Sequence, residues 1–299
     1  PNIITVVNET FADIKVLGDF KTNEDYMPYF HSLKKNCVTG YTYASIVGGQ
    51  TANTEFELLT GNTLGFLSAG TTAFQLYIHG QMPSLVSNLK AEGYSGNKAM
   101  HPFNPYNYNR PAVYKDFGFA DFIDKFDFPK NVKRVREYIS DEANVDRIIS
   151  EYEKNRKKTD QPFYMYNMTI QNHSPYDKDA ANFKQPIKIE SSKYDAEANR
   201  YLNLIKYSDD SLKQLTSYFE KCKEPTIILF LGDHQPRLTD EFMNKITNGQ
   251  YQTWSGEQMM KRYQVPFVIW ANYDIKEQHI EKTSMNYIQS ILTQTAGVK

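Results

Sequence analysis

The sequence predicts an α/β fold in which a mainly parallel central sheet is sandwiched between helices. Short runs rich in apolar, β-branched and aromatic residues recur along the 299-residue chain, and helical patterns lie between them. Several of these runs are apolar on both faces, as strands covered by helices on both sides must be. Strands that alternate with helices in this way are typical of a parallel sheet.

Five short runs carry the strand prediction, and they are spread over the whole chain. Each combines apolar residues with the β-branched and aromatic side chains that favour strands. None approaches the length of a segment that crosses a bilayer. The runs are IITVV (3–7), YTYASIV (41–47), FYMYNMTI (163–170), TIILFL (226–231) and VPFVIW (265–270).

Helical patterns fall between these runs. The segment 82–93 has Pro83 near its start and Gly93 just past its end, which is the usual asymmetry of helix termini. The segment 195–220 is the clearest, because one seam of residues recurs at alternating steps of four and three. That seam is Tyr201, Ile205, Ser208, Leu212, Leu215 and Phe219. Three further helices are predicted: one at 25–35, one that starts directly after Thr51, and one at 141–158. The last has Val145, Ile148, Ile149 and Tyr152 on one face.

The chain is predicted to form a single domain over 1–299, because no linker rich in Pro, Gly or Ser interrupts it. The more irregular last part, about 239–299, is a candidate for a small C-terminal subdomain. Pro1 and Asn2 lead directly into a strand without a signal peptide, which predicts a fragment cut from a longer protein. A membrane anchor upstream would then be missing from this sequence.

Composition argues against some partners and scaffolds. The net charge is −1, and Lys and Arg are scattered rather than gathered in a stripe, which argues against nucleic-acid binding. Cys37 and Cys222 are the only cysteines, and neither lies in a C-x-x-C motif, so no disulfide scaffold is predicted. Both are interpreted as structural residues, and the sequence leaves open whether they pair.

Residues that can carry chemistry follow four of the predicted strands. Glu9, Thr51 and His173 each come after one run, and Asp233 and His234 come together after another. In open α/β sheets the ligand site lies beyond the carboxyl ends of the strands. Each residue alone has an ordinary interpretation as a helix cap, a turn or a loop residue. Together, two carboxylates and an imidazole suit one divalent ion such as Mn²⁺ or Zn²⁺, and a threonine oxygen can complete its shell.

The stretch GGQTANTEFE (48–57) suggests a chemical role for Thr51. A threonine hydroxyl is a poor nucleophile at neutral pH, but a neighbouring divalent cation would lower its pKa. A position at the start of a helix favours an incoming phosphate, and Gly48 and Gly49 would allow a tight turn with room for a substrate. Thr51 is therefore predicted to be both a metal ligand and the nucleophile.

The loop HPFNPYNYNR (101–110) holds further candidates. Arg110 is a natural bidentate partner for a phosphate group, and the ordinary alternative is a surface arginine paired with a carboxylate. Tyr108 could stack on a sugar or glycerol group, or it could simply fill the loop.

Seven landmarks in order carry a resemblance that covers nearly the whole chain: VVNETF (6–11), GGQTANTEFELLTG (48–61), HPFNPYNYNR (101–110), YKDFGF (114–119), QNHSPY (171–176), YSDDSLKQL (207–215) and FLGDHQPR (230–237). With these, the chain resembles the extracellular catalytic domains of lipoteichoic acid synthase-like phosphoglycerol transferases, in the sulfatase and alkaline phosphatase superfamily. It looks closest to the branch that adds glycerol phosphate to cell-wall polysaccharides.

The resemblance implies a sulfatase-like fold, a phosphothreonine intermediate and one divalent metal ion, with Mn²⁺ favoured and Zn²⁺ or Mg²⁺ as alternatives. The residues it implies are Glu9, Thr51, Asp233 and His234 as metal ligands, Thr51, His101 and His173 as catalytic residues, and His101, Tyr108, Arg110 and His173 as substrate contacts.

The chain also departs from the family pattern. The polymerases carry a tryptophan where this chain has Tyr108 and an aspartate where it has Phe103, so the headgroup remains open. Sulfatases proper need a Cys or Ser in a C/S-x-P-x-R setting, and Cys37 is followed by VTGY. Hydrolysis of sulfate esters is therefore disfavoured.

The expected function is transfer of glycerol phosphate from a membrane phospholipid, such as phosphatidylglycerol, to a cell-wall glycan or polyglycerol phosphate acceptor. The expected location is the extracellular face of a bacterial membrane, reached through the missing N-terminal anchor. The alternatives are a phosphoethanolamine transferase or phosphodiesterase of the same superfamily, and a non-catalytic glycan-binding ectodomain. The exact donor, the acceptor and the oligomeric state stay open.

Overall fold

A computed structural model describes residues 1–190 and 195–298, and its centre is a sheet with strand order β10-β2-β9-β8-β1-β7-β3-β4. Among these strands β9 alone runs against the others. The predicted mainly parallel sheet is therefore confirmed. The strands are β1 (Asn2–Asn8), β2 (Cys37–Tyr43), β3 (Ser95–Met100), β4 (Asp121–Ile123), β7 (Phe163–Met168), β8 (Thr226–Gly232), β9 (Gln264–Ala271) and β10 (Gln278–Ser284).

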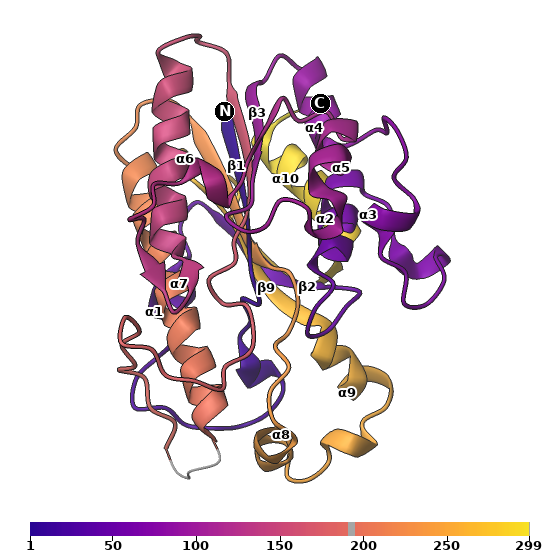
Figure 1. Cartoon of the computed structure of the whole chain (residues 1–299), viewed down its shortest axis with the longest axis vertical. Helices are drawn as coiled ribbons and strands as arrows, with labels where there is room; N and C mark the ends of the chain where they lie inside the picture. Colours follow the sequence, from indigo (N-terminus) through magenta and orange to yellow (C-terminus); the bar gives the residue numbers. More distant parts are fainter. Residues whose placement is uncertain (191–194, 299) are drawn as a thin grey trace.

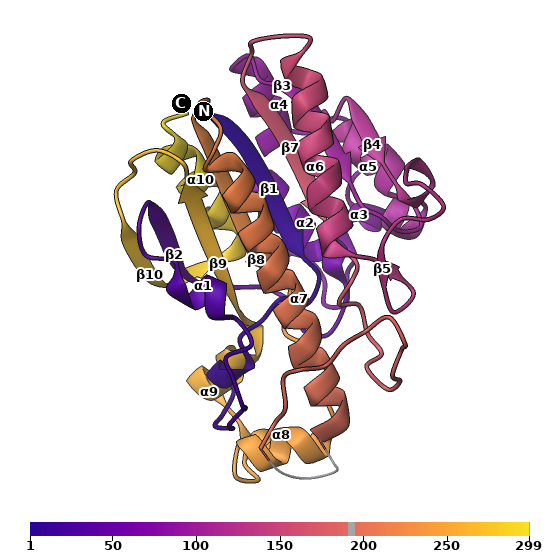
Figure 2. The ribbon, with the colours of Figure 1, turned by 90° about the vertical axis from the view of Figure 1, so that its left-hand side faces the viewer.

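Helices cover both faces of this sheet (Figure 1). One face carries α1 (Pro28–Ser32), α6 (Asp141–Arg156) and α7 (Ala196–Phe219). Figure 2 looks onto this face and shows α6 and α7 in front of the strands. The opposite face carries α2 (Thr51–Thr60), α3 (Ala73–Leu76), α4 (Leu85–Ala91), α5 (Arg110–Asp116) and α10 (Ile288–Ala296).

Alternate residues of the central strands fill two separate cores. On β1, Ile4 and Val6 belong to the core under α6 and α7, whereas Ile3 and Val7 belong to the core under α2, α4 and α10. Successive side chains of a strand point to opposite faces, so a strand between two helical layers must be apolar at every position. This requirement explains why the central strands read as continuous apolar runs.

The long helix α7 follows its predicted seam. All six seam residues, from Tyr201 to Phe219, are buried, and α7 packs beside α6 over the sheet. On α6, Val145, Ile148 and Tyr152 are buried and Ile149 is partly buried. The pattern of four and three therefore identified the buried face of each helix correctly.

The strand predictions miss three strands at or next to the edges of the sheet and misplace one boundary. The run predicted at 41–47 forms a strand only up to Tyr43, and the residues that follow lead out of the sheet towards α2. Strands β3, β4 and β10 were not predicted. Both β4 and β10 are edge strands, and β10 is mostly exposed, so its residues need not be apolar.

The last part of the chain contributes two strands to the same sheet. Between β8 and β9 it forms α8 (Asp240–Ile246) and α9 (Gly256–Met260), which lie at one end of the molecule (Figures 1 and 2). A single domain over 1–299, with a small subdomain at about 239–299, stays a prediction. Over 1–190 and 195–298, no helix combines the length and hydropathy needed to cross a membrane, and Cys37 and Cys222 are both free.

Candidate active site at the carboxyl edge of the sheet

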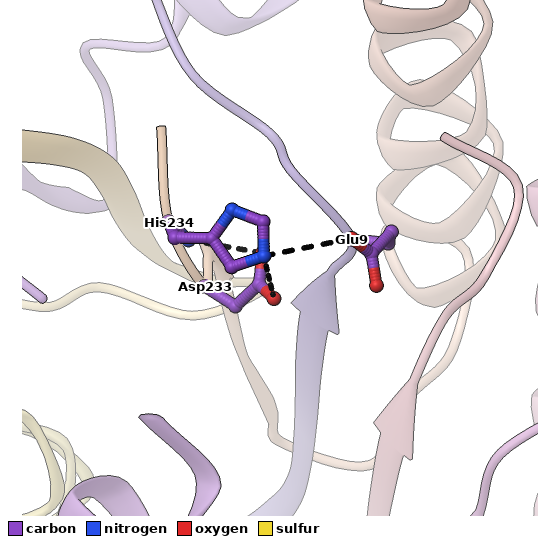
Figure 3. A group of neighbouring side chains, drawn as sticks. All are labelled: Glu9, Asp233 and His234. Carbon is purple, nitrogen blue, oxygen red and sulfur yellow. Dashed lines mark hydrogen bonds and ion pairs between the residues drawn. The ribbon is translucent and has the colours of Figure 1, made fainter. Parts of the chain in front are cut away.

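Three buried side chains meet where β1 and β8 end (Figure 3). Glu9 directly follows β1, and Asp233 and His234 directly follow β8. The two strands are neighbours and run parallel, so their carboxyl ends lie side by side. Each of the three residues offers one ligand atom, and these atoms all lie within 4.8 Å of one another. The predicted convergence of these three residues is confirmed as geometry.

Backbone groups hold Asp233 in place. Its Oδ1 accepts hydrogen bonds from the backbone N–H groups of Thr10 (2.7 Å) and His234 (2.9 Å). Its Oδ2 is buried and has no hydrogen-bond partner among the described residues. The Thr10 hydroxyl donates to Glu9 Oε1 at 2.6 Å, which orients the second carboxylate. One oxygen of Asp233 is thus anchored, and the other faces the cluster.

The His234 ring is held in one tautomer. Its Nδ1 lies 3.0 Å from the Gln235 carbonyl oxygen. A carbonyl can only accept, so Nδ1 carries the proton and neutral His234 has its lone pair on Nε2. Nε2 lies 3.2 Å from Asp233 Oδ2 and 3.7 Å from Glu9 Oε1. Histidines that bind metal usually donate their other N–H to a carbonyl or carboxylate in this way.

Burial and charge perturb the two residues after β8. Burial raises the pKa of Asp233 to about 6, and the nearby Thr51 hydroxyl is among the groups that oppose this rise. Burial lowers the pKa of His234, but the charges of Asp233 and Glu9 outweigh it, so that pKa is raised overall. Two buried carboxyl groups around one imidazole call for a compensating positive charge. The unpartnered Asp233 Oδ2 and His234 Nε2 fit a divalent cation of the Mn²⁺ or Zn²⁺ type.

Thr51 begins α2 next to this cluster. The preceding residues Gly48, Gly49 and Gln50 all have positive φ, at 69°, 150° and 64°. A side chain on Gly49 would meet no atom within 4 Å, so that position opens onto free space. Thr54, one turn into the helix, donates its hydroxyl to the Asp233 carbonyl at 2.8 Å. The start of α2 is thus fixed against the end of β8.

The predicted site residues line one cleft of about 440 Å³. Thr51 lies at one side, only 7% exposed, Tyr108 comes from the turn before α5, and Arg110 is the first residue of α5. Asp233 lies beneath the lining, next to His234 in the chain. The predicted residues on the wall of the cleft are Glu9, Thr51, His101, Tyr108, Arg110, His173 and His234.

His101 and His173 line the cleft and are held in the same tautomer as His234. Nδ1 of His101 lies 3.0 Å from the Met168 carbonyl oxygen, and Nδ1 of His173 lies 2.7 Å from that of Ser174. Both rings therefore carry the proton on Nδ1 and keep Nε2 as the free acceptor when neutral. Burial lowers the pKa of His101 well below its usual value, and the charge of Arg110 adds to this effect. Neutral His101 is suited to accept a proton.

Arg110 is not a free phosphate fork, contrary to the simplest expectation. Its Nε and Nη2 both donate to Glu55 Oε1, at 3.1 and 2.7 Å, and its side chain is 2% exposed. The carbonyl of Asn107 is 3.5 Å from Nη1, and the Tyr108 ring centroid is 5.1 Å from Cζ. The guanidinium edge formed by Nε and Nη2 therefore binds Glu55, and the edge formed by Nη1 and Nη2 is the one that can bind an anion.

Glu55 was missed by the sequence analysis. It is fully buried on α2, one turn after Thr51, and its Oε2 accepts hydrogen bonds from the hydroxyl groups of Tyr114 and Tyr166. The available signal was its place in the sequence, a charged residue four positions after the candidate nucleophile and therefore on the same side of the helix. Its partner could not be read from the sequence, because Arg110 and Tyr166 lie on distant segments.

Phe103 forms a wall of the cleft beside both histidines. Its ring lies edge-on to His101 at 6.1 Å between centroids and stacks on His173 at 6.4 Å. This is one of the positions where the chain departs from the polymerase pattern. An apolar ring here offers no hydrogen bond to a headgroup, so it shapes the space around the imidazoles rather than binding a polar group.

Comparisons with known proteins agree with this architecture. The family model described as "Sulfatase" matches residues 1–298. A Rhizobium meliloti (strain 1021) protein, provisionally named for cyclic beta-1,2-glucan modification, is 32% identical over 99% of this chain and 46% of its own length. Among solved structures, the phosphoglycerol transferase GacH from Streptococcus pyogenes, in complex with sn-glycerol-1-phosphate, has a TM-score of 0.82 at 20% identity, covering 100% of this chain and 75% of that one.

A second solved structure with this fold is the lipoteichoic acid synthase LtaP from Listeria monocytogenes. It has a TM-score of 0.78 at 23% identity and covers 100% of this chain and 72% of that one. At these identities the two structures establish the shared fold. The chain spans 46% of the length of the Rhizobium relative, so that protein contains much that this sequence lacks.

Proposed function

The chain belongs to the sulfatase family, and on that basis we propose that it is a metal-dependent phosphotransferase that moves glycerol phosphate from a phospholipid to a glycan or polyglycerol phosphate acceptor. The observation that carries the proposal is the single cleft that joins Thr51 to the cluster of Glu9, Asp233 and His234. A hydroxyl, two carboxylates and an imidazole at one point suit phosphoryl transfer.

The nucleophile argues for phosphate rather than sulfate chemistry. Thr51 occupies the position at the start of α2, next to the cluster, and threonine is not the Cys or Ser that formylglycine formation requires. A threonine can form a phosphate ester directly and release it again to a second alcohol. The proposed reaction therefore has two displacement steps with a phosphothreonine between them.

In the first step the Thr51 hydroxyl gives its proton to solvent, its oxygen bonds to phosphorus, and the bond from phosphorus to the diacylglycerol oxygen breaks. The departing oxygen needs a proton, which an imidazole in its protonated form can donate. His173 is exposed and can exchange protons with water, whereas His101 is buried. Arg110 supports the phosphoryl oxygens through the guanidinium edge that Glu55 does not occupy.

In the second step an acceptor hydroxyl bonds to phosphorus, and the bond to the Thr51 oxygen breaks. Neutral His101 takes the hydroxyl proton on Nε2, because its Nδ1 is held by the Met168 carbonyl. A divalent cation held by Glu9, Thr51, Asp233 and His234 would supply Lewis acidity and lower the pKa of the threonine hydroxyl. We favour Mn²⁺, with Zn²⁺ or Mg²⁺ as alternatives.

The proposed donor headgroup rests on size and on the fold relatives. A cleft of about 440 Å³ is at the lower end of the range for small-ligand sites and suits a headgroup rather than a whole lipid. The related GacH structure holds sn-glycerol-1-phosphate. A membrane phospholipid donor would in turn place this chain at the extracellular face of a bacterial membrane.

The test is release of diacylglycerol from vesicles that contain phosphatidylglycerol, phosphatidylethanolamine or phosphatidylcholine, with Mn²⁺ present. We expect release from phosphatidylglycerol and little from the other two lipids. Thr51→Ala should be inactive and should remain folded. Preference for phosphatidylethanolamine would assign a phosphoethanolamine transferase instead, and no release from any lipid would reject the proposal.

A further inference from the structure

A second cleft of about 550 Å³ lies next to the candidate site. It is formed by the residues around Phe103, the short turn η4 (Lys125–Asp127), and the hairpin of β5 (Arg134–Val135) and β6 (Tyr138–Ile139). None of the metal-cluster residues lines it. Of its lining residues, only Phe103 was singled out from the sequence, as a departure from the family pattern.

Phe103 is the wall that the two clefts share. On one side it packs against His101 and His173. On the other side it packs against Tyr138, at 6.0 Å between ring centroids, and Tyr138 also contacts His173 at 5.8 Å. The second cleft therefore begins immediately behind the two imidazoles.

The lining of the second cleft is basic and aromatic. Lys125, Lys130 and Arg134 line it, and in the described part of the chain none of the three makes an ion pair. The Lys125 ammonium lies over two rings, 5.0 Å from the centroid of Phe126 and 5.9 Å from that of Phe103. Glu137 is the one acidic residue among the lining residues that the structure describes.

In the part of the chain that the structure describes, the nearby acids form no ion pair with these cations. Asp124 accepts the backbone N–H of Phe126, and Asp127 accepts that of Asp124, so both side chains close their own turn. Lys133 lies close to these cations in the chain but differs from them, because it forms an ion pair with Glu142 and does not line the cleft. Nη1 of Arg134 donates to the backbone carbonyl of Glu137 at 2.9 Å, which leaves its charge without a carboxylate partner among the described residues. Positive charge that no carboxylate pairs with, beside aromatic rings, is what an anionic ligand with sugar or polyol units would require.

The direction of the second displacement connects this cleft to the reaction. Phosphoryl transfer is roughly in line, so the entering hydroxyl must approach phosphorus opposite the Thr51 oxygen. The base that takes its proton must stand beside that hydroxyl within hydrogen-bond reach. His101 and His173 are the candidate bases, and Phe103 packs against both. A hydroxyl that enters from the space behind Phe103 would therefore arrive beside both candidate bases.

We propose that the second cleft binds the acceptor, and that the bound segment is an anionic chain of sugar or polyol units. This inference rests on the proposed transferase function. The chain would lie along Lys125, Lys130 and Arg134 with its terminal hydroxyl over Phe103. That hydroxyl gives its proton to the imidazole, its oxygen bonds to phosphorus, and the Thr51 oxygen leaves and regains a proton from solvent.

Binding can be measured without donor lipid, which separates this inference from the transferase proposal. The probes are three oligomers of equal length that carry the same uncharged dye: a glycerol phosphate oligomer, an oligogalacturonate and a neutral oligoglucoside. Fluorescence polarisation with the whole chain should show binding of at least one anionic oligomer, weakening steeply with salt. The comparison of the two anionic probes distinguishes phosphodiester from carboxylate as the charged group.

Lys130→Ala and Arg134→Ala should each weaken anionic binding about five- to tenfold, and the matched control Lys133→Ala should not. With phosphatidylglycerol vesicles added, the two cleft variants should also lower the ratio of transfer to hydrolysis. Equal binding of the neutral oligomer, or equal behaviour of the cleft variants and Lys133→Ala, would overturn the proposal. Anionic binding with no turnover of any lipid would keep the cleft and reject the transferase function.

Discussion

Arg110 and Glu55 form a buried ion pair that connects the two helices of the candidate site. Nη2 of Arg110 lies 2.7 Å from Glu55 Oε1, and the two side chains are 2% and 0% exposed. Glu55 lies one turn after Thr51 on α2, and Arg110 begins α5. The pair therefore fixes the candidate phosphate-binding cation relative to the candidate nucleophile, although the two helices are far apart in the sequence.

Glu55→Gln should destabilise the fold and weaken substrate capture. The change leaves Arg110 buried without a counter-charge, which typically costs about 3–5 kcal/mol. The matched control is Glu57→Gln on the same helix, because Glu57 is also buried but accepts from Ser45 and the Leu64 backbone rather than from an arginine. Urea unfolding of both variants checks the stability. Diacylglycerol release should show a larger loss in kcat/KM for Glu55→Gln, and equal effects in the two variants would contradict the role of the pair.

Thr51→Ala should abolish lipid turnover with little change in stability. Gln50 occupies the N-cap position and Thr51 is the first residue of the helix, so no capping hydrogen bond is lost. We expect the free energy of unfolding to change by less than about 1 kcal/mol. Thr60→Ala, at the other end of α2, is the control and should keep full activity. Turnover by Thr51→Ala near the wild-type rate would remove Thr51 from the mechanism.

Removal of metal should stop turnover and lower the melting temperature. A cation that binds only the folded state stabilises it by mass action. We expect about one Mn²⁺ or Zn²⁺ per chain, loss of activity in chelator, and recovery with Mn²⁺. Asp233→Asn should lose most of the bound metal, whereas His101→Ala and His173→Ala should keep the metal and lose turnover. Elemental analysis of bound metal, together with the turnover rate of each variant, checks which residues bind the metal and which act on the substrate. Loss of metal in either histidine variant would make that histidine a ligand.

His31, which does not line the cleft, should make the free energy of unfolding depend on pH. Its Nε2 lies 3.6 Å from Asp13 Oδ2, and its Nδ1 lies 2.7 Å from Asp25 Oδ2. The contact with Asp13, joined by that with Asp25, raises the pKa of His31 from 6.5 to about 9 despite its partial burial. The charged form thus stabilises the fold fully below about pH 6.5, and this contribution is lost as the pH rises through about 9.

His31→Gln should therefore lower the free energy of unfolding at pH 6, by up to about 1 kcal/mol for a partly exposed pair. The difference from wild type should shrink towards zero at pH 10. Urea unfolding at pH 6, 8 and 10 measures this, with His79→Gln as a control, because His79 is exposed and makes no ion pair in the described part of the chain. A constant difference across the three pH values would show that His31 acts by packing alone.

The central strands and the convergence of Glu9, Asp233 and His234 could be predicted because their signals are local. A strand buried on both faces must be apolar at every position, so β1, β7, β8 and β9 were visible as continuous runs. Parallel strands bring their carboxyl ends to one edge, so the three polar residues could be placed together from the sequence alone. Edge strands such as β10 carry no such requirement, and the sequence pattern missed them.

Burial and chain direction act within each segment, so the strands of the core and the polar residues that follow them could be read from the order of residues. Three relationships depend instead on packing between segments: Glu55 occupies one edge of Arg110, carbonyl groups hold three histidines in one tautomer, and Phe103 separates two clefts. These relationships arise where helices and loops from distant segments dock on the sheet. Such docking depends on the shape and charge of whole surfaces, and no local pattern along the chain encodes it.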